Sequence, residues 1–222
     1  TTQDAGADAY NVAIGFSAGA SITTGIVNTI IGGLAGDALT TGQANVAIGG
    51  EALSNETDSH SSVAIGYQAL ATQDASSGTN TYNVAVGRSA GLSVTTGNIN
   101  TLVGGLVGDA LTTGDSNVAL GYTALSSETA GHRNVAIGNA ALFAQNNTGS
   151  TNAYNVAVGY DAGKAVTTGD QNTLIGGAAG DALTEGDNNV AVGTFALSAE
   201  TLGDRNVAVG RGCLLYTSDA AD

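Results

Sequence analysis

The 222-residue chain contains no proline, methionine or tryptophan, one cysteine, and only five lysine and arginine residues. Cys213 cannot form a disulfide within the chain, so cysteine usage does not indicate a redox compartment. Aromatic residues make up 5% of the sequence, and no apolar run reaches the roughly 18 residues that a membrane-spanning helix needs. We therefore expect no membrane insertion within this segment.

The few basic residues stand against 19 aspartates and glutamates, which gives a formal net charge of −14. Nucleic acid is excluded as an expected partner, because contacts with phosphates require a basic patch. Docking on anionic lipid is disfavoured for the same reason. A strong negative charge is instead typical of a surface that keeps a protein soluble and limits sideways association.

The main feature that the chain does have is an internal repeat. Glycine, at 34 of 222 residues, is about twice as frequent as usual, and the motif N-V-A-I-G recurs with small changes. Successive copies lie 17 residues apart, with two gaps of 21 residues, so that four copies form a 72-residue superunit. The motif begins at Asn11, Asn28, Asn45, Ser62, Asn83, Asn100, Asn117, Asn134, Asn155, Asn172, Asn189 and Asn206.

These boundaries predict a lead-in over residues 1–10 and one repeat domain over 11–212, with superunits 11–82, 83–154 and an incomplete 155–212. A period of 17 is too short for helical repeats, which need about 33 residues, and suits one coil of a parallel β-solenoid or β-roll. Val12-Ala13-Ile14 predicts a strand and Gly15 a turn with positive φ. A weaker extended piece is expected over 52–57. Twelve coils stacked at about 4.8 Å each would form an all-β rod roughly 55–60 Å long.

The apolar pattern within the strand predicts association of several chains. Val12 and Ile14 share one face, and Ala13 lies on the other. Because strands that are apolar on both faces are buried on both faces, we expect one face to fill the coil. The alanine face would then pack closely against a second and a third copy around a common axis. Three larger residues replace this alanine and are expected to make the interface bulge: Ile30, Leu102 and Leu174.

The motif copies over 62–66 and 134–138, each followed three residues later by alanine, resemble the head repeats of YadA-like trimeric autotransporter adhesins and the related repeats of bacteriophage tail fibres. The resemblance covers residues 11–212, although the coil is longer than the usual head repeat. It implies a left-handed parallel β-roll and a homotrimer. We also expect no cofactor and no enzymatic activity. The resemblance also implies an extracellular fibre that attaches to a host surface receptor, matrix protein or glycan. Such a fibre would belong to a virion tail, or to a bacterial cell surface with an outer-membrane anchor outside this segment.

The extra residues of the two long units are the best candidates for receptor contact, because loops that leave a regular rod can vary without breaking it. The candidate residues are Ser76, Ser77, Thr79, Asn80, Ser150, Thr151 and Asn152.

A calcium-binding or ice-binding β-roll is the alternative function. Glycine-rich turns over 32–39, 104–111 and 176–183 are similar to calcium-binding turns, which makes Asp37, Asp109 and Asp181 candidate metal ligands. Aspartate is also a common turn residue, and these three lie four coils apart. Threonines that share one coil position suggest ice binding, or else hydroxyl contacts along the stack: Thr23, Thr40, Thr57, Thr95, Thr112, Thr129, Thr167, Thr184 and Thr201.

Three further features of the sequence are not expected to form a functional site within one chain. The G-x-S-x-G strings over 15–19 and 87–91 match the nucleophile elbow of hydrolases, but no helix is predicted to follow, and we predict no catalytic site. His60 and His132 share one repeat position and could converge on a metal only around a trimer axis. Residues 213–222 break the repeat and resemble a translated sequencing adaptor, so we predict that they are not native protein.

Overall fold

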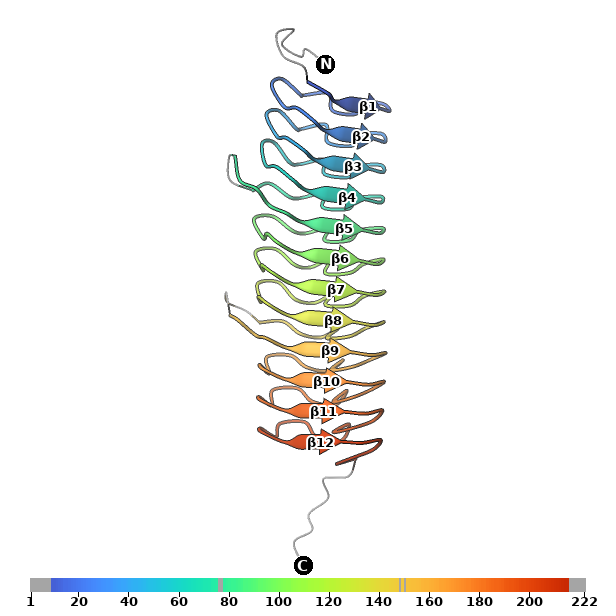
Figure 1. Ribbon diagram of the computed structural model, residues 1–222, viewed down its shortest axis with the longest axis vertical. Coiled ribbons are helices and arrows are strands. Elements are labelled where there is room, and N and C mark those ends of the chain that lie inside the picture. The colour runs from blue at the N-terminus through green and yellow to red at the C-terminus, as the bar shows by residue number, and fades with distance from the viewer. Residues whose placement is uncertain (1–8, 76–77, 148, 150, 216–222) are drawn as a thin grey trace, which may run out of the picture.

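The computed structural model describes residues 9–75, 78–147, 149 and 151–215, and each motif copy there forms one three-residue strand (Figure 1). No helix occurs in these residues. The strands are β1 (Val12–Ile14), β2 (Thr29–Ile31), β3 (Val46–Ile48), β4 (Val63–Ile65), β5 (Val84–Val86), β6 (Thr101–Val103), β7 (Val118–Leu120), β8 (Val135–Ile137), β9 (Val156–Val158), β10 (Thr173–Ile175), β11 (Val190–Val192) and β12 (Val207–Val209).

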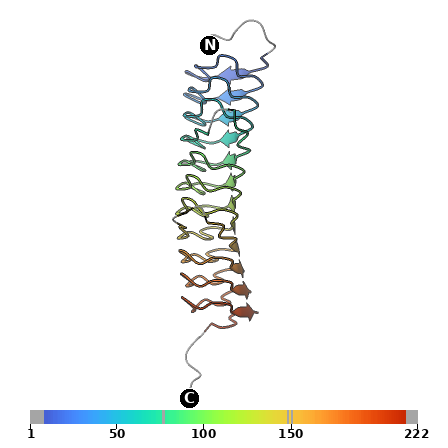
Figure 2. The ribbon, with the colours of Figure 1, turned by 90° about the vertical axis from the view of Figure 1, so that its left-hand side faces the viewer.

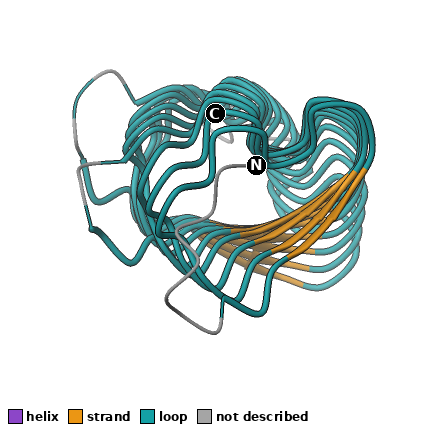
Figure 3. Ribbon diagram, turned by 90° about the horizontal axis from the view of Figure 1, so that it is seen from above, coloured by secondary structure: helices purple, strands orange, loops and turns teal. Residues whose placement is uncertain are grey.

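All twelve strands belong to one parallel sheet whose order follows the chain from β1 to β12. Val46 pairs with Val63, one short coil later, and Val63 pairs with Val84 across the first long coil. The register is kept across the long units, in which His60 pairs with Asn80 and His132 pairs with Asn152. The sheet forms one wall along the whole rod (Figure 2), and the turns form the others (Figure 3). The predicted all-β parallel β-solenoid with 17-residue coils is confirmed.

The middle residue of each strand points into the coil. Ala47 and Ala64 are fully buried, whereas the strand residues on either side of them are only partly buried. The expected orientation was therefore wrong: alanine faces the interior, and the valine and isoleucine columns face outward. The physical reason is the width of the coil, because the interior is thin and the opposite wall already supplies its own large side chains.

Large and small residues alternate across this thin interior. In the second coil, Ile30 is fully buried and Gly36 lies opposite it, where an added Cβ would be 3.2 Å from the Ile30 side chain. In the third coil the sizes are exchanged, since Ala47 is in the strand and the fully buried Leu53 takes the position of the glycine. The larger strand residues therefore fill the interior and do not make an outer interface bulge, contrary to expectation. The same buried position is taken by Leu102 and Leu174.

The remaining walls of each coil consist of turns. The extended piece expected over 52–57 is absent as a strand, and residues 50–55 form turns instead. The chain bends there by placing non-glycine residues in the left-handed region, such as Glu51 and Leu53 with φ of 56° and 54°. Gly49, which directly follows β3, has a φ of 132°, as its turn position predicted.

A ladder of buried asparagines ties successive coils together from the inside. The Asn28 Oδ1 atom accepts the backbone N–H of Asn45 at 2.9 Å, and its Nδ2 atom donates to the Gly42 carbonyl at 2.8 Å. Equivalent bonds join Asn100, Asn117 and Gly114 in the second superunit. These side chains satisfy backbone groups that a coil made mostly of turns would otherwise leave unpaired.

The third coil of the first and second superunits has a buried carboxylate, Glu56 or Glu128, where the preceding coil has an interior leucine. Glu128 is fully buried, and its Oε1 atom accepts the backbone N–H groups of Thr129, Ala130 and Gly131 at 2.9, 3.1 and 2.7 Å. Its Oε2 atom accepts Gln145 Nε2 at 2.9 Å from the next coil. A buried charge is tolerated here because charge-assisted hydrogen bonds surround it.

The coil path continues to the last described residues. Cys213 occupies the position at which the repeat expects alanine, packs against the hydrophobic core, and accepts the Leu197 N–H through its carbonyl at 2.9 Å. Residues 216–222 of the segment predicted to be non-native lie outside the described residues.

Candidate functional site

The outward side of the sheet presents two columns of β-branched and aliphatic side chains along the rod. The first and third residue of every strand are valine, isoleucine, leucine or threonine. Ile14 and Val103 are exposed, and the equivalent residues of most inner coils are partly buried by their neighbours in the stack. No other layer of the described chain covers this face. It is therefore an apolar surface available for packing.

Exposed aromatic residues border this face on both sides. Three tyrosines, one directly before each superunit, precede the asparagine that begins the motif: Tyr10, Tyr82 and Tyr154. Others follow the glycine at the end of a strand: Phe16, Tyr67, Tyr122 and Tyr160. Aromatic side chains of this kind are enriched at protein interfaces.

The two long units project sideways from the rod, on the side of the coil from which the strands start (Figure 3). Each returns through a single parallel bridge, which joins His60 to Asn80 in the first unit and His132 to Asn152 in the second. Backbone hydrogen bonds fix the return, since His132 N–H donates to the Thr151 carbonyl at 2.9 Å and Ala153 N–H donates to the His132 carbonyl at 3.2 Å. The base of each loop is thus part of the stack.

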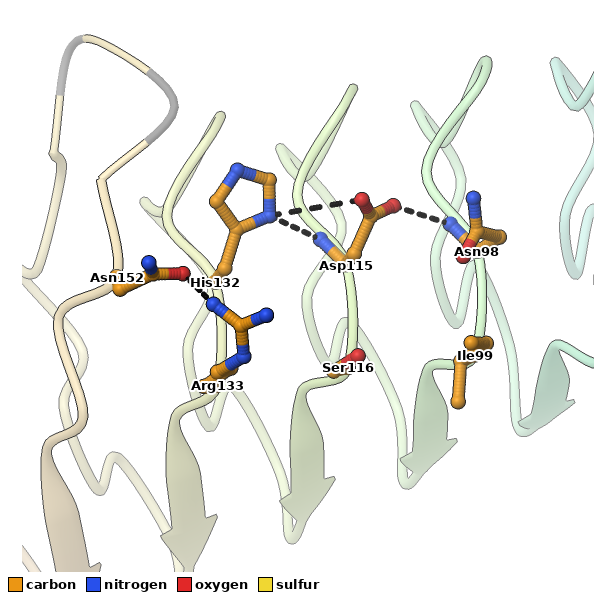
Figure 4. Close-up of a pocket in the computed structure, with 7 residues that line it drawn as sticks. All are labelled: Asn98, Ile99, Asp115, Ser116, His132, Arg133 and Asn152. Atoms are coloured by element: carbon orange, nitrogen blue, oxygen red, sulfur yellow. Dashed lines mark hydrogen bonds and ion pairs between the residues drawn. The ribbon is translucent and has the colours of Figure 1, made fainter.

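A pocket of about 360 Å³ lies beside the second loop (Figure 4). Its lining residues come from four successive coils and include two rows of side chains. The row farther from the strands contains Asn98, Asp115 and His132, and the row nearer to them contains Ile99, Ser116 and Arg133, with Asn152 closing one end.

The outer row is held in place by bonds to the backbone of the preceding coil. Asp115 Oδ1 accepts the Asn98 N–H at 2.8 Å, and His132 Nδ1 accepts the Asp115 N–H at 2.8 Å. Because Nδ1 is an acceptor, the neutral His132 ring carries its proton on Nε2. The second Asp115 oxygen lies 3.8 Å from the same Nδ1 atom. The pocket wall is therefore polar and rigid at its base.

The inner row ends at Arg133, which bridges the pocket and the sheet. Its guanidinium donates to the side-chain oxygen of Asn152 and lies 5.7 Å from the centre of the Tyr154 ring. This distance is within the range of a cation–π contact. Arg133 thereby reaches toward Asn152 at one end of the pocket (Figure 4).

The structure separates the predicted receptor-contact residues into three groups. Asn152 lines the pocket beside the second loop, and Thr151 lines a smaller one of about 190 Å³ with Asn147, Thr168 and Asp170. Thr79 and Asn80 lie in the return of the first loop. The predicted residues Ser76, Ser77 and Ser150 lie outside the described residues.

The candidate metal ligands do not come together. Asp37, Asp109 and Asp181 are partly buried, and each has one buried carboxylate oxygen without a hydrogen-bond partner. Burial raises the pKa of Asp181 above its usual range, and Asp161 raises it further. Among the described residues, no three His, Cys, Asp or Glu side chains form a group that could hold a metal ion. Calcium binding thus stays a prediction without a ligand set.

The other sequence candidates have structural partners. His60 Nδ1 accepts the Gln43 N–H at 3.0 Å, which is the same backbone contact that His132 makes. Threonine hydroxyls donate to the carbonyl of the next coil, as Thr40 Oγ1 does to Thr57 at 2.9 Å, so the predicted hydroxyl contacts along the stack are confirmed. Ser89, in the second G-x-S-x-G string, is buried, and no helix follows it in the described chain.

Sequence reasoning missed Asp115 and Arg133, the two charged residues of the pocket. A signal was present, because a polar residue that can accept a backbone N–H recurs just before the left-handed residue that precedes the motif. Its significance depends on which side chains the stack places next to one another, and the repeat pattern alone does not show this.

Comparison with known proteins gives no match: no family model, no curated protein and no solved structure matches this chain. Within the described residues there is also no helix with the length and hydrophobicity to cross a lipid bilayer.

Proposed function

We propose that this chain is a segment of a homotrimeric, extracellular fibre that is structural and adhesive rather than catalytic. The observation that carries the proposal is the uncovered apolar face of a twelve-strand sheet that extends along the whole rod. Contiguous exposed apolar surfaces on this scale mark interaction sites, because exposing them to water is unfavourable.

The distribution of charge supports the same conclusion. The chain carries 19 acidic residues, yet none occupies an outward strand position or the positions that directly border the strands. Depletion of charge is characteristic of the core of an interface, and a polar rim surrounds it. The face can therefore pack against other copies without bringing carboxylates together, despite the net charge of −14.

The number of copies and the hand of the coil are taken from the resemblance to trimeric adhesin and tail-fibre repeats, which implies a left-handed roll in threes. Side-by-side copies would cover the valine and isoleucine columns of one another and leave the loops at the outer edge. Loops at an outer edge are free to meet a receptor, matrix protein or glycan on a host surface.

Attachment is tested with two lysine variants that differ only in the face that they change. Ile137→Lys places a charge in the middle of the apolar face. Ala20→Lys is the control, because Lys164 already occupies the equivalent position in the third superunit. Fluorescently labelled protein is incubated with bacterial and animal cells, and bound fluorescence is measured. We expect wild type and Ala20→Lys to bind one of the cell types and Ile137→Lys to lose most of this binding. Equal binding by all three, or none by the wild type, would contradict an adhesive role that depends on the face.

A further inference from the structure

We infer that the pocket between Asn98 and Asn152 binds a neutral, polyhydroxylated saccharide. Saccharide binding in this pocket would be the way in which the fibre attaches to a host surface, so this inference rests on the proposed adhesive function. The pocket volume of about 360 Å³ falls within the range of small-molecule sites, roughly 300–1,000 Å³.

The groups that line the pocket match the hydroxyls of a sugar. Asp115 Oδ2 accepts no hydrogen bond within the described chain, and the side-chain amide of Asn98 makes none there. His132 presents an Nε2–H donor, since its Nδ1 atom is occupied by the Asp115 N–H. A carboxylate beside an amide and an imidazole offers acceptors and donors at neighbouring points, and adjacent sugar hydroxyls need both.

The inner row adds apolar contact beside these polar groups. Ile99 is 55% exposed and lies one residue from Asn98, and the Tyr154 ring supports the Arg133 guanidinium. A sugar ring has C–H groups as well as hydroxyls, so a site of this kind buries the former while it bonds the latter. The two rows provide both surfaces within one pocket (Figure 4).

The charges favour a neutral ligand over an acidic one. Arg133 brings one positive charge and Asp115 one negative charge, so the charges of these two lining residues cancel. An anion would also approach a chain that carries −14 overall, and this field opposes its association. A neutral saccharide meets neither obstacle.

The combination of Asn98, Asp115, His132 and Arg133 occurs in the second of the three superunits only. The first superunit has Gln43 and Ser61 where the second has Asp115 and Arg133. The third has Asp187 and Arg205 at these positions, but Asp204 replaces the histidine. Asp187 caps the Asp170 N–H at 2.8 Å, which is the backbone contact that Asp115 makes to Asn98. The first superunit therefore provides the residues to substitute into the pocket, and Asp187 of the third superunit provides a control position.

The test compares wild type with Asp115→Gln/Arg133→Ser and with Asp187→Gln, all as the 222-residue chain. The double variant installs the residues of the first superunit and removes both charged groups of the pocket. The control loses the same kind of backbone cap outside the pocket. Each protein is applied to a printed array of neutral hexose and N-acetylhexosamine oligosaccharides with their sialylated and sulfated counterparts. Circular dichroism melting confirms that all three are folded.

We expect wild type and Asp187→Gln to bind one or more neutral saccharides. The double variant should bind them at least about tenfold more weakly, as the loss of charge-assisted hydrogen bonds predicts. Binding to acidic saccharides alone, to no saccharide, or equally by all three proteins would overturn the inference. Cell attachment separates the two proposals. If cells are bound equally by wild type and the double variant, the fibre function stands and the pocket is not its binding site. Saccharide binding without cell attachment would refute the adhesive function, while the inference that the pocket binds a saccharide would stand.

Discussion

Residues 11–82 and 83–154 form the same four coils with interiors that correspond position by position, but their loop edges differ. Ile30 and Leu53 of the first superunit match Leu102 and Leu125 of the second, and all four are fully buried. At the edge, by contrast, the first superunit has no charged residue at the positions of Asp115 and Arg133. Stacking constrains whatever points inward or touches the next coil, and leaves the outer edge free to acquire a binding site.

The largest effect is expected where stacking allows no side chain at all. A Cβ on Gly32 would overlap the carbonyl oxygen of Gly49 in the next coil, and the residue has a φ of 140°. Its neighbour Gly33 has no heavy atom within 4 Å of an added Cβ. We expect Gly32→Ala to lower the free energy of unfolding by more than about 4 kcal/mol, and Gly33→Ala to change it by under about 1 kcal/mol. Urea unfolding followed by circular dichroism measures both, and equal midpoints would contradict this account of the stack.

The next effect tests whether the interior alternates in size as described. Leu102→Ala removes a fully buried side chain and should cost roughly 3 kcal/mol, in the range for leucine truncations in a core. The double variant Leu102→Ala/Gly108→Leu installs the pattern of the following coil, in which Ala119 and Leu125 are both fully buried.

This exchange should recover at least half of the loss, because Leu125 has nearly the same φ, 54°, as the 52° of Gly108. The free energy of unfolding is compared for both variants in urea. A double variant that is less stable than Leu102→Ala would show that the two positions do not share one space.

A smaller effect is expected from the buried carboxylate that both superunits share. Glu128→Gln keeps the size of the side chain but places an amide where Oε2 accepts Gln145 Nε2. We expect a loss of about 2 kcal/mol in unfolding free energy, the usual scale for hydrogen bonds to a buried charged group. Glu185→Gln, at an exposed position, is the control and should be nearly neutral. Thermal melts that shift equally for the two variants would argue against a special role for Glu128.

The smallest effect concerns an edge position at which the superunits differ, Asn98 in the second and Asp170 in the third. Burial is the main cause that raises the pKa of Asp170, and Asp187 and Glu128 raise it further. A carboxyl whose pKa is higher in the folded state binds more protons there than in the unfolded chain. The free energy of unfolding should therefore fall as the pH rises above 3.8, the ordinary pKa of an aspartate side chain.

Asp170→Asn removes this effect and installs the residue of the second superunit. At pH 7 we expect a gain of no more than about 0.5 kcal/mol, because the group is partly solvated. Below the unfolded pKa the gain should disappear. Melting temperatures measured across this pH range test the sign, and a variant less stable than wild type at pH 7 would reverse it.

The sequence predicts the architecture well because stacked coils need the same residue types at the same positions, which produces the repeat. Glycine follows every strand and occupies the tight turn, and asparagine precedes every strand except β4, which follows Ser62, and forms the internal ladder. The repeat did not show which face of the strands points into the coil. Alternation places Val46 and Ala47 on opposite faces of the sheet, but it does not identify the face that meets the opposite wall of the coil. The size exchange between Ile30 and Gly36 was the available signal, and it lies six residues apart in the sequence.

The candidate site was predicted less completely. Asn152 was a candidate for receptor contact because of its position in an insertion, and the structure places it at one end of the pocket. Its contact with a receptor stays a prediction. Asp115 and Arg133 lie in ordinary coils and become part of a site only because stacking brings residues 17 or more positions apart into contact. A pocket formed between coils has no contiguous motif in the sequence.

The central claim, that the outward sheet face packs against further copies of the chain, is tested most directly by the mass in solution. Light scattering on the purified chain is predicted to give three times the 21.5 kDa of one copy. Ile137→Lys should reduce this mass to that of one copy, and Ala20→Lys should leave it unchanged. A wild-type chain that is folded and monomeric at micromolar concentration would contradict the claim.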